Sequence, residues 1–261
     1  HLEEALIATE DVRFYKHSGI DAKALFRVTA GVLTGRRKGG GSTISQQLAK
    51  NLFPRNEDPS VFQLVLTKFK EWVVAVKLER NYSKTEIIAM YLNTVDFGNL
   101  SHGIKSAAKT YFDKEAKDLN IEESALLVGM LKAPTRYSPR RHPENALNRR
   151  NTVIEQMVKY DFLDEEKGDS IKKIPIDMSR FKVQDHKVGV ATYFREFLRK
   201  EIATWAKNNP KPDGTTWDIY KDGLKIYTTI NYKMQVYAEE AVDEWVKGNL
   251  QPLFFKHWAG H

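Results

Sequence analysis

Through most of the first 160 positions, apolar residues recur at intervals of three and four, which places them on one side of an α-helix. This spacing predicts helices over residues 2–9, 21–32, 61–78, 104–112, 121–132 and 143–159. Another predicted helix opens at Ser83, which forms a capping-box pattern with Glu86. Because no convincing strand precedes residue 160, we expect this part of the fold to be mainly α-helical.

The broadest apolar stripe lies within residues 61–78 and has two interpretations. Its members recur at helical spacing and are Phe62, Val65, Leu66, Phe69, Trp72, Val73 and Val76. We interpret most of this stripe as core. The alternative is contact with an anionic membrane surface, since Lys68 and Lys70 are interleaved with the apolar residues.

After residue 160 the pattern changes. Residues 172–177 resemble a loop, residues 191–207 an amphipathic helix, and residues 208–214 a turn-rich break. Residues 224–230 alternate between apolar and polar side chains, which predicts a strand. We therefore expect two units, a helical one over residues 1–178 and a small α+β one over residues 179–261.

Composition limits the possible chemistry. The chain has 41 Lys and Arg against 34 Asp and Glu, a net charge of +7 that favours anionic partners and is equally explained by solubility. It has no cysteine, which excludes disulfides, thiolate metal sites and cysteine nucleophiles. Its longest apolar runs fall short of the ~20 residues of a spanning helix. The chain starts inside an amphipathic segment without a signal-peptide pattern, so we expect further residues upstream.

Two polar clusters in the first 51 residues carry the candidate chemistry. Residues 10–19 read EDVRFYKHSG and place the carboxylates of Glu10 and Asp11 beside an aromatic residue. Residues 39–51 read GGGSTISQQLAKN and provide a row of hydroxyl and amide groups, after a glycine-rich loop expected over residues 35–41. An acid/base group beside such donors suits a sugar or phosphate ligand, so the clusters predict an active-site cleft.

Five segments in this order resemble the family 51 peptidoglycan glycosyltransferases, the polymerase domain of class A penicillin-binding proteins. The resemblance covers most of the chain. The segments are Glu10-Asp11 with Phe14, His17 and Gly19; residues 41–43 with Gln46, Gln47, Lys50 and Asn51; Lys68 with Glu71; Lys84 with Ile87, Ile88, Tyr91, Leu92 and Asn93; and residues 125–127 with Ala133, Pro134, Tyr137, Pro139 and residues 149–151.

The resemblance implies a lysozyme-like glycosyltransferase domain with a small membrane-proximal lobe. It also implies that lipid II is polymerised onto a nascent glycan chain with inversion at the donor anomeric carbon and release of lipid pyrophosphate. Glu10 matches the catalytic base, which takes the proton from the attacking 4-hydroxyl. The alternative for Glu10 is an ordinary helix carboxylate.

Glu71 matches a second catalytic glutamate near the leaving pyrophosphate, acting through a divalent cation such as Mg²⁺ or through basic side chains. A surface salt bridge with Lys68 is the alternative. Lys50 and Lys68 match the cations that face the leaving group. Thr67 and Gln63 stand where the family often has arginines, and Arg55 or Lys70 is expected to compensate.

The remaining candidates are expected to bind substrate or shape the cleft. Hydrogen bonds to sugar and phosphate oxygens are expected from Ser42, Thr43, Gln46 and Gln47, although the first two also suit helix caps. Phe14 and His17 are expected to shape the cleft rather than transfer protons. Asp11 and Asn93 complete the candidate substrate-binding residues, and a structural role is the alternative for Asn93.

Residues 223–242 resemble the linker that joins the polymerase to the transpeptidase in bifunctional members, and no serine motif of a transpeptidase follows. Residues 179–261 are therefore expected to lead toward a transpeptidase domain outside this chain. The implied location is the extracytoplasmic face of the bacterial cytoplasmic membrane. The implied partners are lipid II, the membrane surface and other cell-wall synthesis proteins, with no nucleic acid.

Two other functions were weighed. A lysozyme-like hydrolase or lytic transglycosylase would use a single acidic glutamate on a similar scaffold, but it has no evident need for Lys50 and the paired glutamines. A nucleic-acid-binding module rests on net charge alone, because the chain lacks zinc-ligand spacing and an aromatic-basic sheet pattern.

Overall fold

The computed structural model describes residues 1–33, 40–53, 60–183, 189–220 and 222–259. Contacts divide the chain into two units, His1–Gln184 and Asp185–His261. The sequence placed this division between residues 178 and 179. Phe181 packs against the core of the first unit, and the Lys182 N–H donates to the Thr110 carbonyl at 2.9 Å, so this short segment lies with the first unit.

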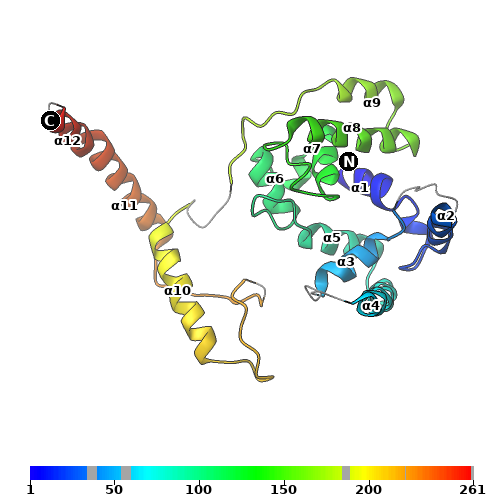
Figure 1. Ribbon diagram of the computed structural model, residues 1–261. Helices are drawn as coiled ribbons and strands as arrows, with labels where there is room; N and C mark the ends of the chain where they lie inside the picture. The colour runs from blue at the N-terminus through cyan, green and yellow to red at the C-terminus, as the bar shows by residue number, and fades with distance from the viewer. Residues whose placement is uncertain (34–39, 54–59, 184–188, 221, 260–261) are drawn as a thin grey trace. The chain divides into compact units, whose positions relative to one another are not determined.

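The first unit is built from helices, as predicted (Figure 1). They are α1 (Leu2–Glu10), α2 (Ala22–Leu33), α3 (Ile44–Leu52), α4 (Val61–Asn81), α5 (Lys84–Thr94), α6 (Ile104–Phe112), α7 (Ile121–Met130), α8 (Pro143–Lys159) and α9 (Glu165–Lys172), with the 3₁₀ turns η1 (Phe14–Lys16) and η2 (Ala116–Asp118).

Several helices begin where polar side chains replace the missing backbone partners of the first turn. Asp21 Oδ1 accepts from the N–H groups of Lys23 and Ala24 at the start of α2. Thr43 and Gln46 form a capping box at α3, and Ser83 and Glu86 form the predicted one at α5. The sequence thus determines where the helices around the polar clusters start.

The core of the first unit surrounds α1. This helix packs against α7 and α8, while α3 packs against α4 and α5. Four consecutive residues of α1, Ala5 to Ala8, are buried, so this helix is enclosed rather than amphipathic. Its last residue is Glu10, which the core therefore places at a fixed position.

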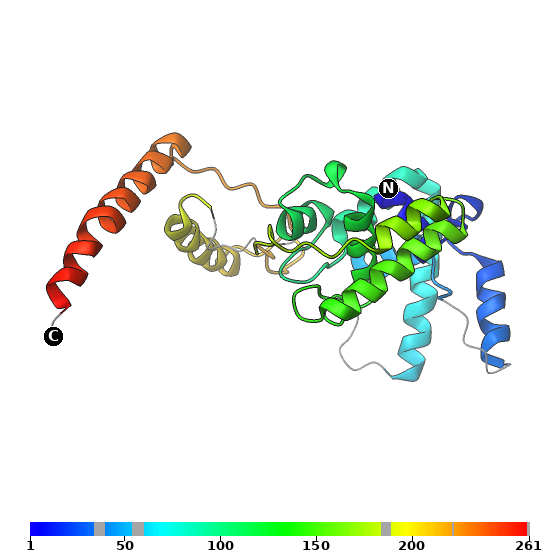
Figure 2. The same ribbon diagram turned by 90° about the horizontal axis from the view of Figure 1, so that it is seen from above.

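The core interpretation of residues 61–78 is wrong for most of the stripe. The first half of α4 exposes apolar side chains, and Phe62 is 71% and Phe69 55% exposed, whereas the buried positions of α4 are Glu71 and Ala75. The reason is that α2 and the first half of α4 project away from the other helices of this unit (Figure 2). Within the described residues, no helix is long and apolar enough to cross a membrane.

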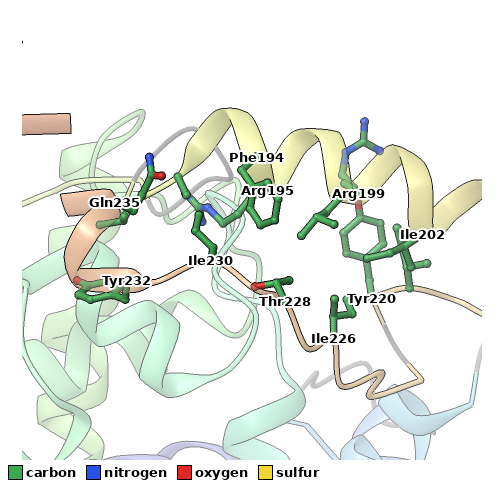
Figure 3. Close-up of a pocket in the computed structure, with 15 residues that line it drawn as sticks. Phe194, Arg195, Arg199, Ile202, Tyr220, Ile226, Thr228, Ile230, Tyr232 and Gln235 are labelled. Carbon is green, nitrogen blue, oxygen red and sulfur yellow. The ribbon is translucent and has the colours of Figure 1, made fainter. Parts of the chain in front are cut away.

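The second unit contains α10 (Thr192–Asn208), α11 (Tyr232–Trp245), the π-helical turn η3 (Val246–Leu250) and α12 (Gln251–Trp258). The strand predicted over residues 224–230 is wrong, and so is the α+β description, because the described residues contain only one isolated bridge, between Asp96 and His102. Residues 224–230 lack a neighbouring strand with which to form a hydrogen-bonded ladder. Their apolar side chains instead line a groove along α10 (Figure 3).

The turn between α1 and α2 depends on a glycine. Gly19 has a φ of +94°, and a Cβ atom there would lie 2.9 Å from the backbone carbon and oxygen of Ala75 in α4. We predict that Gly19→Ala lowers the stability of the protein by about 2 to 4 kcal/mol, from backbone strain and overpacking. Urea denaturation followed by circular dichroism measures this loss.

Gly40→Ala is the matched control, because Gly40 lacks a positive φ and its Cβ would meet no atom within 4 Å. The control is expected to be as stable as the unchanged protein. An equal loss of stability in both variants would contradict the packing of Gly19 on α4.

Candidate active site

Glu10 stands at the end of α1 with a hydrogen-bond donor on one oxygen and a cation near the other. Gln47 Nε2, from α3, donates to Glu10 Oε2 at 2.9 Å. An Arg149 guanidinium nitrogen, from α8, lies 4.0 Å from Glu10 Oε1, and the Glu10 side chain is 19% exposed. The two neighbours thus lie at different oxygens of the carboxylate, and its partial exposure leaves room for a ligand.

Tyr91 extends this arrangement from α5. Its hydroxyl donates to Gln47 Oε1 at 3.0 Å, so the Gln47 amide is held at both ends. Burial raises the pKa of Tyr91, and the nearby charge of Glu10 raises it further. The sequence analysis assigned no role to Tyr91 or Arg149. The position of Tyr91 within the apolar run of residues 87–92 could have indicated a buried polar contact, because a buried tyrosine hydroxyl requires a hydrogen-bond partner.

Asp11 binds protein groups rather than pointing into open space. Its Oδ2 accepts from the Ile44 N–H at 3.1 Å, at the N-terminus of α3, and lies 3.0 Å from His17 Nε2. A helix N-terminus favours a carboxylate, because the first N–H groups lack intrahelical partners. His17 Nδ1 in turn accepts from the Gly19 N–H at 3.2 Å. Asp11 therefore joins the turn after α1 to the start of α3.

The ion pair of Lys84 and Glu79 also contacts the turn after α1. Lys84, the first residue of α5, donates to the Glu79 carboxylate at 2.8 Å and to the His17 carbonyl at 2.7 Å. Its ammonium group also lies 4.2 Å from the centre of the Phe14 ring, a cation–π contact. Ser45 Oγ donates to Glu79 Oε1 at 2.5 Å. The sequence analysis quoted Lys84 as part of a motif, and nothing in the sequence pairs it with Glu79.

Among the predicted hydrogen-bonding residues of α3, two are used by the fold. Thr43 caps the helix, and its Oγ1 also donates to the Gly19 carbonyl at 2.7 Å. Gln46 is buried and its Oε1 accepts from the Thr43 N–H at 3.2 Å. Gln47, by contrast, reaches the carboxylate of Glu10.

Lys68, Glu71 and Ser42 lie together beside this cluster. Lys68 Nζ donates to Glu71 Oε2 at 2.8 Å and to Ser42 Oγ at 3.3 Å. The pair that the sequence predicted is present, but Glu71 is buried rather than on the surface. No three His, Asp or Glu side chains gather as metal ligands in the described part of the chain, so the protein groups around Glu71 do not by themselves fit a metal site.

Two further predicted residues are exposed, and a third is not described. Lys50 is exposed in the last turn of α3, and Asn93 is exposed in α5. Arg55 lies outside the described residues.

A further cavity belongs to the second unit and not to these motifs. It has a volume of about 550 Å³ and lies between α10 and the extended segment (Figure 3). Its lining is mainly apolar and includes Phe194, Leu198, Ile202, Ile226 and Ile230. The sequence analysis predicted no ligand there.

Comparison with known proteins matches residues 1–158 to the family described as Transglycosylase. The chain is 35% identical to penicillin-binding protein 1A of Aquifex aeolicus, over 95% of this chain and 32% of that protein. It is 46% identical to penicillin-binding protein 1F of Bacillus subtilis, over 60% of this chain and 21% of that protein. A crystal structure of penicillin-binding protein 1A from Haemophilus influenzae matches 76% of this chain and 23% of its own, with 25% identity and a TM-score of 0.36. The chain spans about a third of the length of the curated relatives it matches.

The ion pair of Lys84 and Glu79 is largely enclosed, since the two side chains are 21% and 4% exposed. We predict that Lys84→Met lowers stability by about 2 to 4 kcal/mol, because it leaves the carboxylate of Glu79 buried without its cation. Chemical denaturation measures this change.

Lys109→Met removes a lysine from a solvent-exposed pair with Asp113 and is the matched control. That variant is expected to lose no measurable stability, because exposed pairs contribute little. If both lysine variants are equally stable, the pair of Lys84 and Glu79 does not support the turn.

Proposed function

Because this chain belongs to the transglycosylase family, we propose that its first unit is a peptidoglycan glycosyltransferase that polymerises lipid II. The relatives are penicillin-binding proteins, and the family match includes Glu10, Gln47, Lys68, Glu71 and Arg149. We further propose that the helices form a lysozyme-like domain, with α2 and the first half of α4 as its membrane-proximal lobe. The second unit is proposed to be the linker region that leads toward a transpeptidase.

In the proposed reaction Glu10 is the general base. It takes the proton from the 4-hydroxyl of the N-acetylglucosamine of lipid II as that oxygen attacks the anomeric carbon of the glycan donor. The bond between the anomeric carbon and the pyrophosphate oxygen breaks on the opposite face, which inverts the configuration. The observation that carries this assignment is the environment of Glu10, whose partly exposed carboxylate accepts from Gln47 on one oxygen and lies near Arg149 on the other.

Lys68 is proposed to face the leaving pyrophosphate, together with Lys50. The departing group gains negative charge, which cations and oriented donors stabilise in the transition state. Glu71 supports this role because its carboxylate holds the Lys68 ammonium group beside Ser42. A divalent cation such as Mg²⁺ would have to take most of its ligands from phosphate oxygens and water. No step of the proposed reaction is assigned to a metal ion.

The remaining predicted residues are proposed to act through position. Asp11, His17 and Phe14 hold the turn after α1, and Thr43 and Gln46 hold the start of α3. Ser42 is proposed to contact substrate beside Lys68. Arg55 and Asn93 remain proposed substrate contacts, without a described contact to the Glu10 cluster.

Polymerisation of fluorescent lipid II in detergent tests the assignment of Glu10. We predict that Glu10→Gln lowers the rate by about 100-fold or more, because the amide keeps the shape of the side chain but cannot accept the proton. Lipid II binding by this variant is expected to be retained.

Glu155→Gln, at an exposed position of α8, is the control and should polymerise normally. Equal activity of the Glu10→Gln variant would contradict the assignment of the base. Release of reducing sugar from finished peptidoglycan, without polymer from lipid II, would instead indicate a hydrolase.

We also propose that the exposed apolar side of α4 rests on the membrane that holds the substrate, at the extracytoplasmic face of the cytoplasmic membrane. The apolar residues concerned are more than a third exposed, recur at helical spacing and lie in the first half of the helix; they are Phe62, Val65, Leu66 and Phe69. Lys68 and Lys70 lie on the same half and suit anionic head groups. Lipid II and the nascent glycan chain are thus proposed partners, along with other cell-wall synthesis proteins.

Binding to anionic phospholipid vesicles, measured by sedimentation, tests this surface. Replacing Phe62 and Phe69 together by Ser is predicted to weaken binding by at least about tenfold, because two aromatic side chains no longer leave water. Tyr82→Ser, an exposed aromatic position just past the end of α4, is expected to bind like the unchanged protein. Equal losses in both would place the contact elsewhere.

A further inference from the structure

We propose that Tyr91 is a positioning residue that fixes the orientation of the Gln47 side-chain amide, so that Gln47 presents an N–H and not its carbonyl oxygen to Glu10. The inference rests on the proposed function for its catalytic meaning, since it concerns the group assigned as the base. It assigns a role to a residue that neither the motifs nor the comparisons explain.

The two ends of the Gln47 amide have different partners. Gln47 Oε1 accepts from the Tyr91 hydroxyl at 3.0 Å, and Gln47 Nε2 donates to Glu10 Oε2 at 2.9 Å. An ionised carboxylate can only accept, so Glu10 requires the amide nitrogen. The amide oxygen then faces Tyr91, which must donate. The three groups form a chain of hydrogen bonds that all run in one direction, toward Glu10.

Tyr91 is suited to remain the donor. The residue is 2% exposed, and burial, with a further contribution from the charge of Glu10, raises the pKa of its hydroxyl. The proton therefore stays on the hydroxyl at the pH values at which a carboxylate can act as a base. Because α3 and α5 pack together, the core also fixes the position of the ring relative to Gln47.

Without the Tyr91 hydroxyl, Gln47 loses the donor that holds its amide oxygen away from Glu10. Rotation by half a turn would bring the Gln47 oxygen to Glu10, and only a protonated Glu10 can donate to that oxygen. The turned amide therefore stabilises the carboxylic acid and weakens the base. Tyr91 prevents this by holding the oxygen on its own side.

Other charged groups near Glu10 do not replace this control. Arg149 of α8 lies 4.0 Å from the opposite oxygen of Glu10. Asp11 follows Glu10 in sequence and is bound to Ile44 and His17. The other helix packed on α1 is α7, whose acidic residues lie in its first turn, where Glu123 pairs with Lys114. Among the described groups that face Glu10, only the Gln47 amide has one end that donates a hydrogen bond and another that accepts one.

The test compares Tyr91→Phe with Tyr111→Phe. Tyr111 is an equally buried tyrosine of the first unit, and its hydroxyl donates to the Phe97 carbonyl. The ¹³C resonance of the Glu10 carboxyl carbon, identified by its loss in Glu10→Gln, is followed as a function of pH. Removing a donor from the ionised form raises the titration midpoint, and we expect a rise of about one pH unit in Tyr91→Phe and none in Tyr111→Phe. An unchanged midpoint in the first variant, or an equal rise in both, overturns the proposal.

A second comparison separates an effect through Gln47 from a direct one. In a Gln47→Met background there is no amide to orient, so Tyr91→Phe is expected to leave the midpoint where Gln47→Met alone has put it. If the tyrosine substitution raises the midpoint as much in this background as in the unchanged protein, Tyr91 does not act through Gln47.

Lipid II polymerisation then relates the titration to catalysis. The acidic limb of the pH profile of kcat/KM is expected to move upward in Tyr91→Phe by the same amount as the resonance, and a limb that does not move would show that Tyr91 does not tune the base. If the unchanged protein forms no polymer, the proposed function fails, while the resonance still decides whether Tyr91 orients the amide.

Discussion

The arrangement of the site depends on a buried carboxylate that needs hydrogen-bond donors. Asp11 is enclosed, and a buried carboxylate without partners would destabilise the fold by several kcal/mol. It finds donors at the N-terminus of α3 and on the His17 ring, which joins two segments that are separated in sequence. Once α3 is held there, Gln47 one turn later reaches Glu10. The pairing of Gln47 with Glu10 thus follows from an interaction made by the residue next to Glu10.

Much of the helical scaffold could be predicted from the sequence, because its signals are local. The helices at residues 104–112 and 143–159 have the predicted bounds, and the capping box at Ser83 is present. The prediction failed where a local pattern has two structural meanings. The stripe of α4 has the spacing of a core helix, but its first half projects from the unit and is exposed. The alternation at residues 224–230 is that of a strand, and a strand needs a partner that local spacing does not supply.

The candidate site shows the same limit. Its polar residues stood out in sequence, but their partners did not, because the contacts join residues far apart in the chain. Gln47, which is predicted to bind sugar or phosphate, contacts Glu10 and Tyr91, and neither contact could be read from the sequence. Thr43 and Gln46 serve the helix cap. The partners of Arg149 and Glu79 are set by the fold. Arg149 of α8 comes near Glu10 at the end of α1, and Glu79 near the end of α4 pairs with Lys84.

The absence of a side chain at Gly19 lets the turn after α1 lie close to the backbone of α4 at Ala75. The first half of this helix projects with apolar side chains exposed, and further along it Ala75 lies so close to Gly19 that a Cβ atom there would meet its backbone at 2.9 Å. There is no side chain at Gly19 to absorb a displacement, and close-packed backbones transmit strain. The helix that exposes apolar side chains therefore also limits the position of the turn that follows Glu10 and Asp11.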